Sequence, residues 1–323
     1  MATAQPHYKH LKEKSVSIVL APFSGGQGKG GVENGPDYML KHGLEKQLQE
    51  LGWKTSIKEP LKDTNYEELK QTATEKSATS KTKRGDLVGE ATKKIYNTCK
   101  NEIGDDFQLT IGGDHSIAMG SIAGLLQRYP DAGIIWIDAH ADINTVTTTE
   151  SGNLHGCPVS FLMGLDKENY PPELQWIPNQ VLKTDKICYI GLRDVDAGEK
   201  KILQENNIKA FSMYHVDRFG INSVVEMAID HVSKGNKDCP LMISYDVDAL
   251  EPSYVKCTGT MVKNGLTLRE GFFICERIAE TGNLVALDVV EVNPELGTND
   301  MDILDTIMAG CAVVRCTMGE TLL

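Results

Sequence analysis

The chain has 323 residues, of which 41% are hydrophobic, and a formal net charge of −12 at pH 7. It is long enough to bury a large core, and its acidity argues against a nucleic-acid partner, because phosphate binding needs a concentrated basic face. No apolar run approaches the roughly 20 residues that cross a bilayer, and the amino terminus lacks the apolar core of a signal peptide, so we expect a cytoplasmic protein without a membrane partner.

Short apolar runs of strand length alternate with longer amphipathic stretches along the chain. In chain order, the predicted strands are 15–23, 54–59, 107–113, 132–138, 186–194, 209–216, 240–248 and 283–292. The amphipathic stretches predicted as helices are 36–52, 86–103, 222–235, 266–282 and 302–316. The stretch 61–85, rich in Lys, Thr, Glu and Ser, predicts a polar surface loop.

This alternation is typical of β-α-β units and a mostly parallel sheet. Several strands are apolar on both faces, which indicates that helices cover both sides of the sheet. We therefore predict an α/β fold with three α-β-α layers and about eight strands. The sequence has no internal repeat and no interdomain linker, so we expect a single domain over 1–323.

Eight cysteines are scattered along the chain without a C-x-x-C pair, and several lie inside apolar runs. Buried, reduced thiols show this distribution, whereas the cysteines of a disulfide framework do not. The spacing also excludes a zinc ribbon. Cysteine usage therefore favours the same cytoplasmic compartment.

Acidic and imidazole side chains follow directly after several predicted strands. Parallel sheets bind their ligands at the carboxyl ends of the strands, so these residues are candidates for a site. Alternate residues of an extended segment point the same way, so Asp138, His140 and Asp142 can converge, as can Asp246 and Asp248. His115, which follows the run FQLTI, adds a second imidazole.

These six residues, four carboxylates and two imidazoles, exceed what one small divalent ion usually takes from a protein. Two ions bridged by shared carboxylates fit better, roughly 3.5 to 4 Å apart. Two divalent cations would also neutralise four carboxylates that otherwise repel one another. Oxygen ligands with two imidazoles and no thiolate favour Mn²⁺, so we predict a dinuclear manganese site.

Each motif also has a plainer interpretation. The pair Asp246 and Asp248 alone could cap a helix or hold a nucleotide-bound metal, and Asp114 in GGDHS could cap the following helix. The pattern D-x-H-x-D at the end of a buried strand is harder to explain without a metal, because unpaired buried charges are costly. The three motifs together favour the metal site.

The motifs resemble those of the ureohydrolase family and, within it, the arginases. The sequence most resembles eukaryotic arginases, fungal ones among them, and the resemblance spans nearly the whole chain. It is carried by GGDHS (112–116), DAHADIN (138–144), SGNLHG (151–156), SYDVD (244–248) and EVNP (291–294), with further matches at 21–36, 191–199 and 265–271.

The resemblance implies a three-layer fold with two Mn²⁺ per subunit that hydrolyses L-arginine to L-ornithine and urea through a metal-bridging hydroxide. Asp138 and Asp246 would bridge the ions. One ion would be held by His115, Asp138, Asp142 and Asp246. The other would be held by Asp138, His140, Asp246 and Asp248.

Matching positions also receive catalytic and substrate-binding roles from the resemblance. Asp142 would accept a hydrogen bond from the hydroxide and pass the proton to the leaving amine. Glu291 would face the guanidinium group, and His155 would shuttle protons at the mouth of the site. The implied substrate contacts are Asn144, Ser151 and Asn153 for the α-carboxylate, Asp196 for the α-amino group, Glu199 through water, and Thr260 in the guanidinium pocket.

Two alternatives stay open. The chain could hydrolyse another guanidino compound, either agmatine or a guanidino acid, although agmatinases lack the loop INT…SGNLHG and this favours arginine. It could instead be a metal-binding, arginase-like regulatory protein with weakened catalysis. Because arginases are often trimers, the resemblance further implies a homotrimer.

Departures from the arginase pattern are concentrated in one segment. Ala249, Glu251, Lys256, Cys257 and Met261 stand where the family usually has Gly, Asp, Pro, Ala and Pro. None of these residues is an expected metal ligand. Ala249 loses the backbone freedom of glycine, and the loss of two prolines predicts a more flexible pocket wall; both changes affect activity and substrate affinity more than metal binding.

Overall fold

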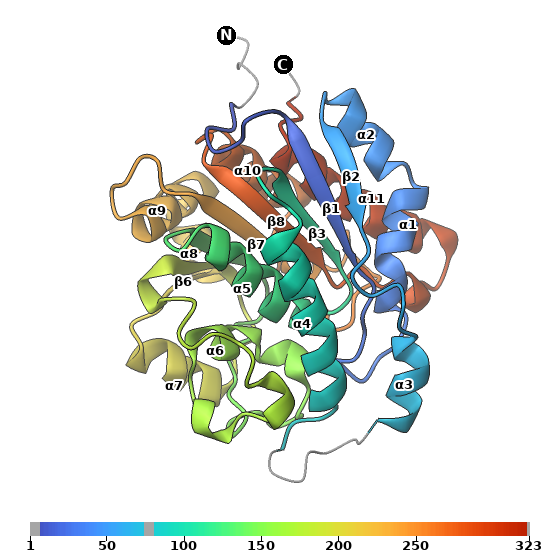
Figure 1. Cartoon of the computed structure of the whole chain (residues 1–323). Coiled ribbons are helices and arrows are strands. Elements are labelled where there is room, and N and C mark those ends of the chain that lie inside the picture. The colour runs from blue at the N-terminus through green and yellow to red at the C-terminus, as the bar shows by residue number, and fades with distance from the viewer. Residues whose placement is uncertain (1–6, 74–80, 322–323) are drawn as a thin grey trace.

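A single eight-stranded sheet forms the centre of the protein, in a computed structural model that describes residues 7–73 and 81–321. The strand order is β2-β1-β3-β8-β7-β4-β5-β6, and every pairing in it is parallel (Figure 1). The predicted eight-stranded sheet is therefore confirmed. The strands are β1 (Ser15–Ala21), β2 (Lys54–Lys58), β3 (Phe107–Gly112), β4 (Gly133–Ile137), β5 (Ile187–Leu192), β6 (Lys209–Ser212), β7 (Leu241–Asp246) and β8 (Leu284–Val290).

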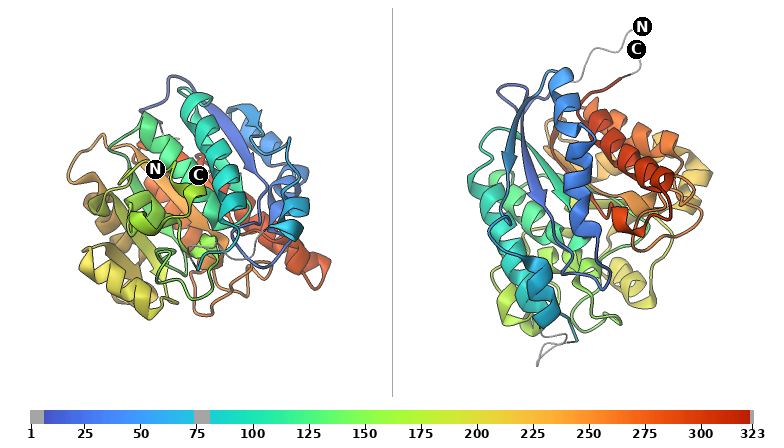
Figure 2. Two further views of the ribbon diagram at one scale, coloured as in Figure 1. Left: turned by 60° about the horizontal axis from the view of Figure 1, so that its bottom comes forward. Right: turned by 90° about the vertical axis from the view of Figure 1, so that its right-hand side faces the viewer.

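Helices cover both faces of this sheet, which confirms the three layers. Buried side chains of α1, α2, α8, α9, α10 and α11 pack on one face, and those of α3 to α7 pack on the other. The right-hand view of Figure 2 shows α4 and the carboxyl-terminal helix on opposite sides of the strands. The helices are α1 (Gly35–Lys41), α2 (Leu44–Glu50), α3 (Tyr66–Thr72), α4 (Gly85–Asn101), α5 (Ala118–Arg128), α6 (Pro158–Met163), α7 (Ala197–Glu205), α8 (Met213–Phe219), α9 (Ile221–Ser233), α10 (Leu268–Ala279) and α11 (Asp300–Thr317).

Strand composition explains why these segments pair in the interior. β3, β4, β5, β7 and β8 are buried at every position, as expected for parallel strands that are covered on both sides. β2 at one edge of the sheet has no fully buried residue. Within the described ranges, none of the helices combines the length and the apolarity that a bilayer crossing needs.

Two predicted elements are shorter than expected. The helix predicted over 36–52 is interrupted, because α1 ends at Lys41 and α2 starts at Leu44, with Gly43 at φ 85° between them. A glycine adopts this left-handed conformation without strain. The strand predicted over 209–216 stops at Ser212, which caps α8.

The stretch predicted as a polar loop, 61–85, contains a helix. Asn65 caps α3 by accepting a hydrogen bond from the Glu68 backbone N–H at 3.2 Å. Tyr66 is buried beside Phe23, and their rings meet edge to face at 5.3 Å. Residues 74–80 of the stretch lie outside the described residues. The prediction of a polar surface loop was therefore wrong for Tyr66–Thr72, which form α3.

Candidate metal centre

The four central strands bring the candidate ligands to one edge of the sheet. β3, β8, β7 and β4 are consecutive in the parallel sheet, so their carboxyl ends lie side by side. Asp246 is the last residue of β7, and Asp138 follows β4 directly. His115 begins the short 3-10 turn after β3, where Asp114 accepts the Ser116 backbone N–H at 3.0 Å and so has the capping role considered for it.

A first group of ligand atoms surrounds the His115 ring. Its Nδ1 lies 3.1 Å from Asp138 Oδ2, 3.2 Å from Asp142 Oδ2 and 3.4 Å from Asp246 Oδ2. All four residues are buried. His115, Asp138 and Asp246 together can hold one metal ion, with Asp142 adjacent.

A second group lies around His140. Its Nδ1 is 3.1 Å from Asp248 Oδ2 and 3.4 Å from Asp138 Oδ1. These three residues can hold a second ion. Asp138 thus presents one carboxylate oxygen to each imidazole, as a bridging ligand would. Asp246 belongs to the first group, and its Oδ1 accepts the Asp248 backbone N–H at 2.8 Å.

The environment of His115 fits a cation rather than a proton at Nδ1. Its Nε2 lies 2.9 Å from the Ser244 hydroxyl, and the Trp136 ring stacks on the imidazole at 4.1 Å, which together fix the ring. With Nε2–H donating to Ser244, Nδ1 has a lone pair that faces three carboxylates. This buried Nδ1 forms no hydrogen bond of acceptable geometry with a described residue. A metal ion would satisfy both the lone pair and the carboxylates.

The charges of the site lead to the same conclusion. Burial and the neighbouring charges of Asp248 and Asp138 raise the pKa of Asp246 well above its usual range. Burial and Asp138 raise the pKa of Asp142 to about 6. Carboxylates this close cannot all ionise without added positive charge, so the residues present fit a site for two divalent cations.

Glu291 follows β8 and forms a buried anion beside the first group. Its Oε2 accepts from Gln27 Nε2 at 2.6 Å, and its Oε1 accepts from the His115 backbone N–H at 3.0 Å. His155 Nδ1 lies 3.3 Å from the same Oε1. Burial opposes a charge on His155, but Glu291 raises the pKa of His155 to about 9. His155, predicted at the mouth, thus lies against Glu291 with its side chain 18% exposed.

Two of these acidic residues have unusual backbone conformations. Asp142 has φ 49° and Glu291 has φ 65°, both in the left-handed region that non-glycine residues seldom adopt. Such conformations cluster at functional sites, where surrounding contacts maintain the strain. Here Asp142 O accepts the Val159 N–H at 3.1 Å, and Glu291 N donates to Gly113 O at 2.9 Å.

The start of α7 is tied to the loop that follows the metal ligands. Asp196 and Glu199 form a reciprocal capping box, and Asp196 Oδ2 also accepts from Asn144 Nδ2 at 2.7 Å. Glu199 Oε1 accepts from the Ile143 N–H at 3.3 Å, and burial raises the pKa of Glu199 to about 8. The predicted substrate residues Asn144, Asp196 and Glu199 are therefore brought together, and Glu199 also has a structural role.

The other predicted substrate residues lie in two separate loop segments. Ser151 is exposed, and its hydroxyl accepts the Asn153 N–H at 3.2 Å in the loop that leads to His155. Thr260 donates to Asp248 Oδ2 at 3.0 Å, so it contacts the second ligand group directly.

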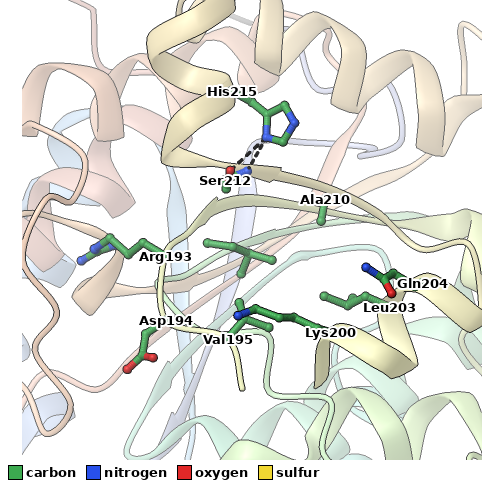
Figure 3. Close-up of a pocket in the computed structure, with 10 residues that line it drawn as sticks. Arg193, Asp194, Val195, Lys200, Leu203, Gln204, Ala210, Ser212 and His215 are labelled. Carbon is green, nitrogen blue, oxygen red and sulfur yellow. Dashed lines mark hydrogen bonds between the residues drawn. The ribbon is translucent and has the colours of Figure 1, made fainter. Parts of the chain in front are cut away.

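Sequence reasoning did not single out Gln27 or Arg193, although both lie inside stretches that carry the resemblance. Arg193 donates to the backbone oxygens of Asp248 at 2.6 Å and Val262 at 2.7 Å, and so secures the turn that carries Asp248. It borders a hollow of about 610 Å³ but points away from the other lining residues (Figure 3). Asp194, in the same hollow, lies 3.9 Å from His140 Nε2.

Comparison with known proteins identifies relatives over nearly the full length. The pattern of the Arginase family matches residues 14–319. An arginase of Saccharomyces cerevisiae is 55% identical, covering 98% of this chain and 99% of that protein. An arginase of Eremothecium gossypii is 57% identical, covering 98% of this chain and 79% of that protein. The arginase structure from Bacillus caldovelox has a TM-score of 0.86 at 32% identity, covering 96% of this chain and all of that one.

Proposed function

The chain belongs to the arginase family, and from that membership we propose that it hydrolyses L-arginine to L-ornithine and urea at the edge of the sheet described above. The observation that carries the proposal is the convergence of two ligand groups on Asp138, next to the buried carboxylate of Glu291. Family membership alone would not require both features to be intact in this chain.

We propose that two Mn²⁺ ions are the resident cofactor. His115, Asp138, Asp142 and Asp246 would hold one ion, and Asp138, His140, Asp246 and Asp248 the other. The oxygen-rich donor set with two imidazoles suits Mn²⁺. Two bound ions would lower the pKa of a water molecule between them, so that a nucleophile is available near neutral pH.

Three residues would then handle charge and protons. Glu291 would receive the guanidinium group, because its buried carboxylate matches a planar cation with several N–H donors. Asp142, 3.2 Å from His115, would accept a proton from the attacking water and deliver it to the leaving nitrogen. Through these steps the guanidinium C–N bond breaks, and the amine of ornithine leaves protonated.

His155 is placed to exchange protons with solvent. It contacts Glu291 and remains partly exposed, so it connects the reacting end of the substrate to the outside. The Glu291 carboxylate raises the pKa of His155 to about 9, so the ring would be charged before substrate binds and could release its proton once the guanidinium group takes its place at Glu291. In the free enzyme the His155 contact occupies Glu291, and the substrate guanidinium would replace it.

The loop after the metal ligands and the start of α7 would select an α-amino acid. Asp196 would pair with the α-amino group, while Asn144, Ser151 and Asn153 would donate to the α-carboxylate. Glu199 would act through water, and Thr260 would line the guanidinium pocket. Agmatine lacks the α-carboxylate, so these contacts favour arginine over agmatine.

A direct assay tests the proposal. The purified protein, incubated with Mn²⁺ and L-arginine, should release urea and ornithine in equal amounts. Agmatine and a guanidino acid of similar length should react far more slowly at equal concentration. A folded protein with two bound ions per chain that releases no urea would disprove the proposal, and faster turnover of agmatine would reassign the substrate.

We also propose a cytoplasmic location and a homotrimer. All eight cysteines are free and buried, which suits a reducing compartment. One stripe of α11 exposes Met301, Leu304 and Met308 next to Tyr254, and exposed apolar surface of this kind favours association between subunits. Light scattering at micromolar concentration would give three times the mass of the chain, whereas a monomer would rule the trimer out.

A further inference from the structure

The segment 251–262, between the Asp248 turn and α10, forms a wall of the site next to Glu291. A Cβ atom placed on Gly259 would lie 3.0 Å from Gln27 Oε1 and 3.7 Å from Glu291 Oε2. The next residue, Thr260, donates to Asp248 Oδ2 at 3.0 Å. The position of this backbone therefore sets the space available to a group bound at Glu291.

This wall coincides with the departures from the family pattern. Lys256 and Met261 stand where arginases usually have proline, so the segment lacks two residues with a fixed φ. It contains no helix or strand. Contacts with other elements therefore hold the wall in place, among them the hydrogen bonds from Lys29 to Gly259 O and from Arg193 to Val262 O.

Lys256 supplies such a restraint. Its ammonium lies 2.6 Å from Asp302 Oδ1 in the first turn of α11, and the Asp302 side chain is only 9% exposed. Asp302 Oδ2 accepts from the Thr298 hydroxyl and from Asn299 Nδ2, each at 2.8 Å. The hydrogen bond from Lys256 lowers the pKa of Asp302. Because the carboxylate is already oriented, this ion pair has better geometry than most surface pairs.

The neighbouring residue attaches the wall to the same helix. Cys257 N donates to the Thr306 hydroxyl at 3.1 Å, one turn further along α11, and Cys257 O accepts from Asn293 N at 2.9 Å. Lys256 and Cys257 thus fix the wall at two adjacent points. From there the chain continues directly to Gly259 and Thr260.

We propose that Lys256 is a positioning residue whose ion pair with Asp302 replaces the rigidity of the missing proline and holds the wall against Glu291. The inference rests on the proposed function. The restraint acts on the shape of the guanidinium pocket, because neither Lys256 nor Asp302 forms a hydrogen bond or ion pair with a candidate metal ligand. Its loss should therefore raise KM for arginine and leave kcat and metal content unchanged.

Three substitutions at one position separate charge from rigidity. Lys256→Met removes the ammonium and should raise KM about two- to fivefold, the scale of a well-formed but partly exposed ion pair. Lys256→Arg keeps the charge and should restore most of the affinity. Lys256→Pro brings back the family residue and should give a KM near that of the wild type. The Lys256 N–H donates to no other described residue, so proline at this position removes no backbone hydrogen bond.

Partner and control variants complete the test. Asp302→Asn should raise KM as Lys256→Met does, and the double variant should add no further increase, because both changes remove one interaction. Lys183→Met, which breaks the exposed 3.3 Å pair with Asp131 at the amino ends of the strands, should leave KM unchanged. Hydrogen exchange of residues 251–262 should accelerate in Lys256→Met and not in Lys256→Pro.

The outcomes distinguish this inference from the proposed function. If the wild-type protein produces no urea, the proposed function fails, and hydrogen exchange alone decides whether Lys256 restrains the wall. If the wild type is active but Lys256→Met has the wild-type KM, the inference is overturned. It is equally overturned if Lys256→Pro shows the same KM increase as Lys256→Met, because rigidity would then not be the quantity that matters.

Discussion

The substitution Glu291→Gln tests the central electrostatic assignment most directly. The side chain is 1% exposed, and its oxygens accept from Gln27, from the His115 backbone and from His155. Glutamine has nearly the same shape and the same difficulty with φ 65°, so backbone strain is unchanged. The substitution removes the negative charge. It also replaces one carboxylate oxygen by an NH₂ group, whose hydrogens face the donors that now contact Glu291.

The size of the effect follows from the loss of one buried, charge-assisted hydrogen bond to the substrate. Such a bond contributes about 1.5–3 kcal/mol, and each 1.36 kcal/mol is a tenfold change in rate. We therefore expect kcat/KM for arginine to fall about 10- to 150-fold on this scale. Initial rates of urea release over a range of arginine concentrations would measure it.

Two controls keep the interpretation clear. The exposed Glu295, four positions further along, can be changed to Gln to remove an equal charge outside the cleft, with no expected change in rate. Metal content, measured by atomic absorption, should stay at the wild-type value in both variants. A Glu291→Gln enzyme with wild-type kcat/KM would show that the carboxylate does not bind the guanidinium group.

Three further predictions concern neighbouring groups. Asp142→Asn should reduce kcat by about 10²- to 10⁴-fold, the range for a lost proton acceptor, while circular dichroism stays native because Asn tolerates φ 49°. Asp196→Asn should keep the α7 cap and lose arginine affinity, whereas Asp196→Ala should also cost about 1 kcal/mol in urea unfolding; equal stability of the two variants would contradict the capping role. Removing bound metal with a chelator should lower Tm by several degrees, and Mn²⁺ should restore it, because binding at about 100 times Kd adds about 2.7 kcal/mol; an unchanged Tm would argue against a buried metal pair.

Most of the sheet could be predicted from the sequence, because its strands are buried on both faces and form short, nearly continuous apolar runs. Helix α5 was not predicted, since nine of its residues are buried and it lacks the polar stripe of an amphipathic pattern. The break between α1 and α2 was also missed. It depends on Gly43 in a left-handed conformation, and a single glycine inside a helical pattern is a weak signal.

The ligand set was predictable for a different reason. Parallel strands end at one edge of the sheet, so Asp138, His140 and Asp248 could be placed near one another from the sequence. The expected alternation along an extended chain was wrong, because residues 138–140 bend, Asp142 is left-handed at φ 49° and Asp248 lies in a 3-10 turn. Supporting residues such as Ser244 and Gln27 carry no charge, and no sequence periodicity points to their role. Only the folded chain shows that Ser244 orients His115 and that Gln27 binds Glu291.

The contact between His155 and Glu291 could not be predicted from the sequence. The resemblance placed His155 at the mouth of the site, and the structure adds that its ring lies 3.3 Å from the Glu291 carboxylate with the side chain 18% exposed. A loop histidine has no periodic pattern that indicates its depth. Its contact arises because the His155 backbone N–H donates to Gly26 O, which draws the loop toward the β1 end of the cleft.

Burial of all eight thiols has a practical consequence for studying how this protein moves. Burial raises the pKa of Cys311 to about 11 and that of Cys188 and Cys275 to about 12, so these three thiols offer alkylating reagents neither access nor thiolate in the native state. Each cysteine is thus a silent probe that reacts only when its surroundings open. Time-resolved alkylation followed by mass spectrometry would compare the opening rate of the wall, reported by Cys257, with that of α4, reported by Cys99. No cysteine would have to be introduced for this measurement.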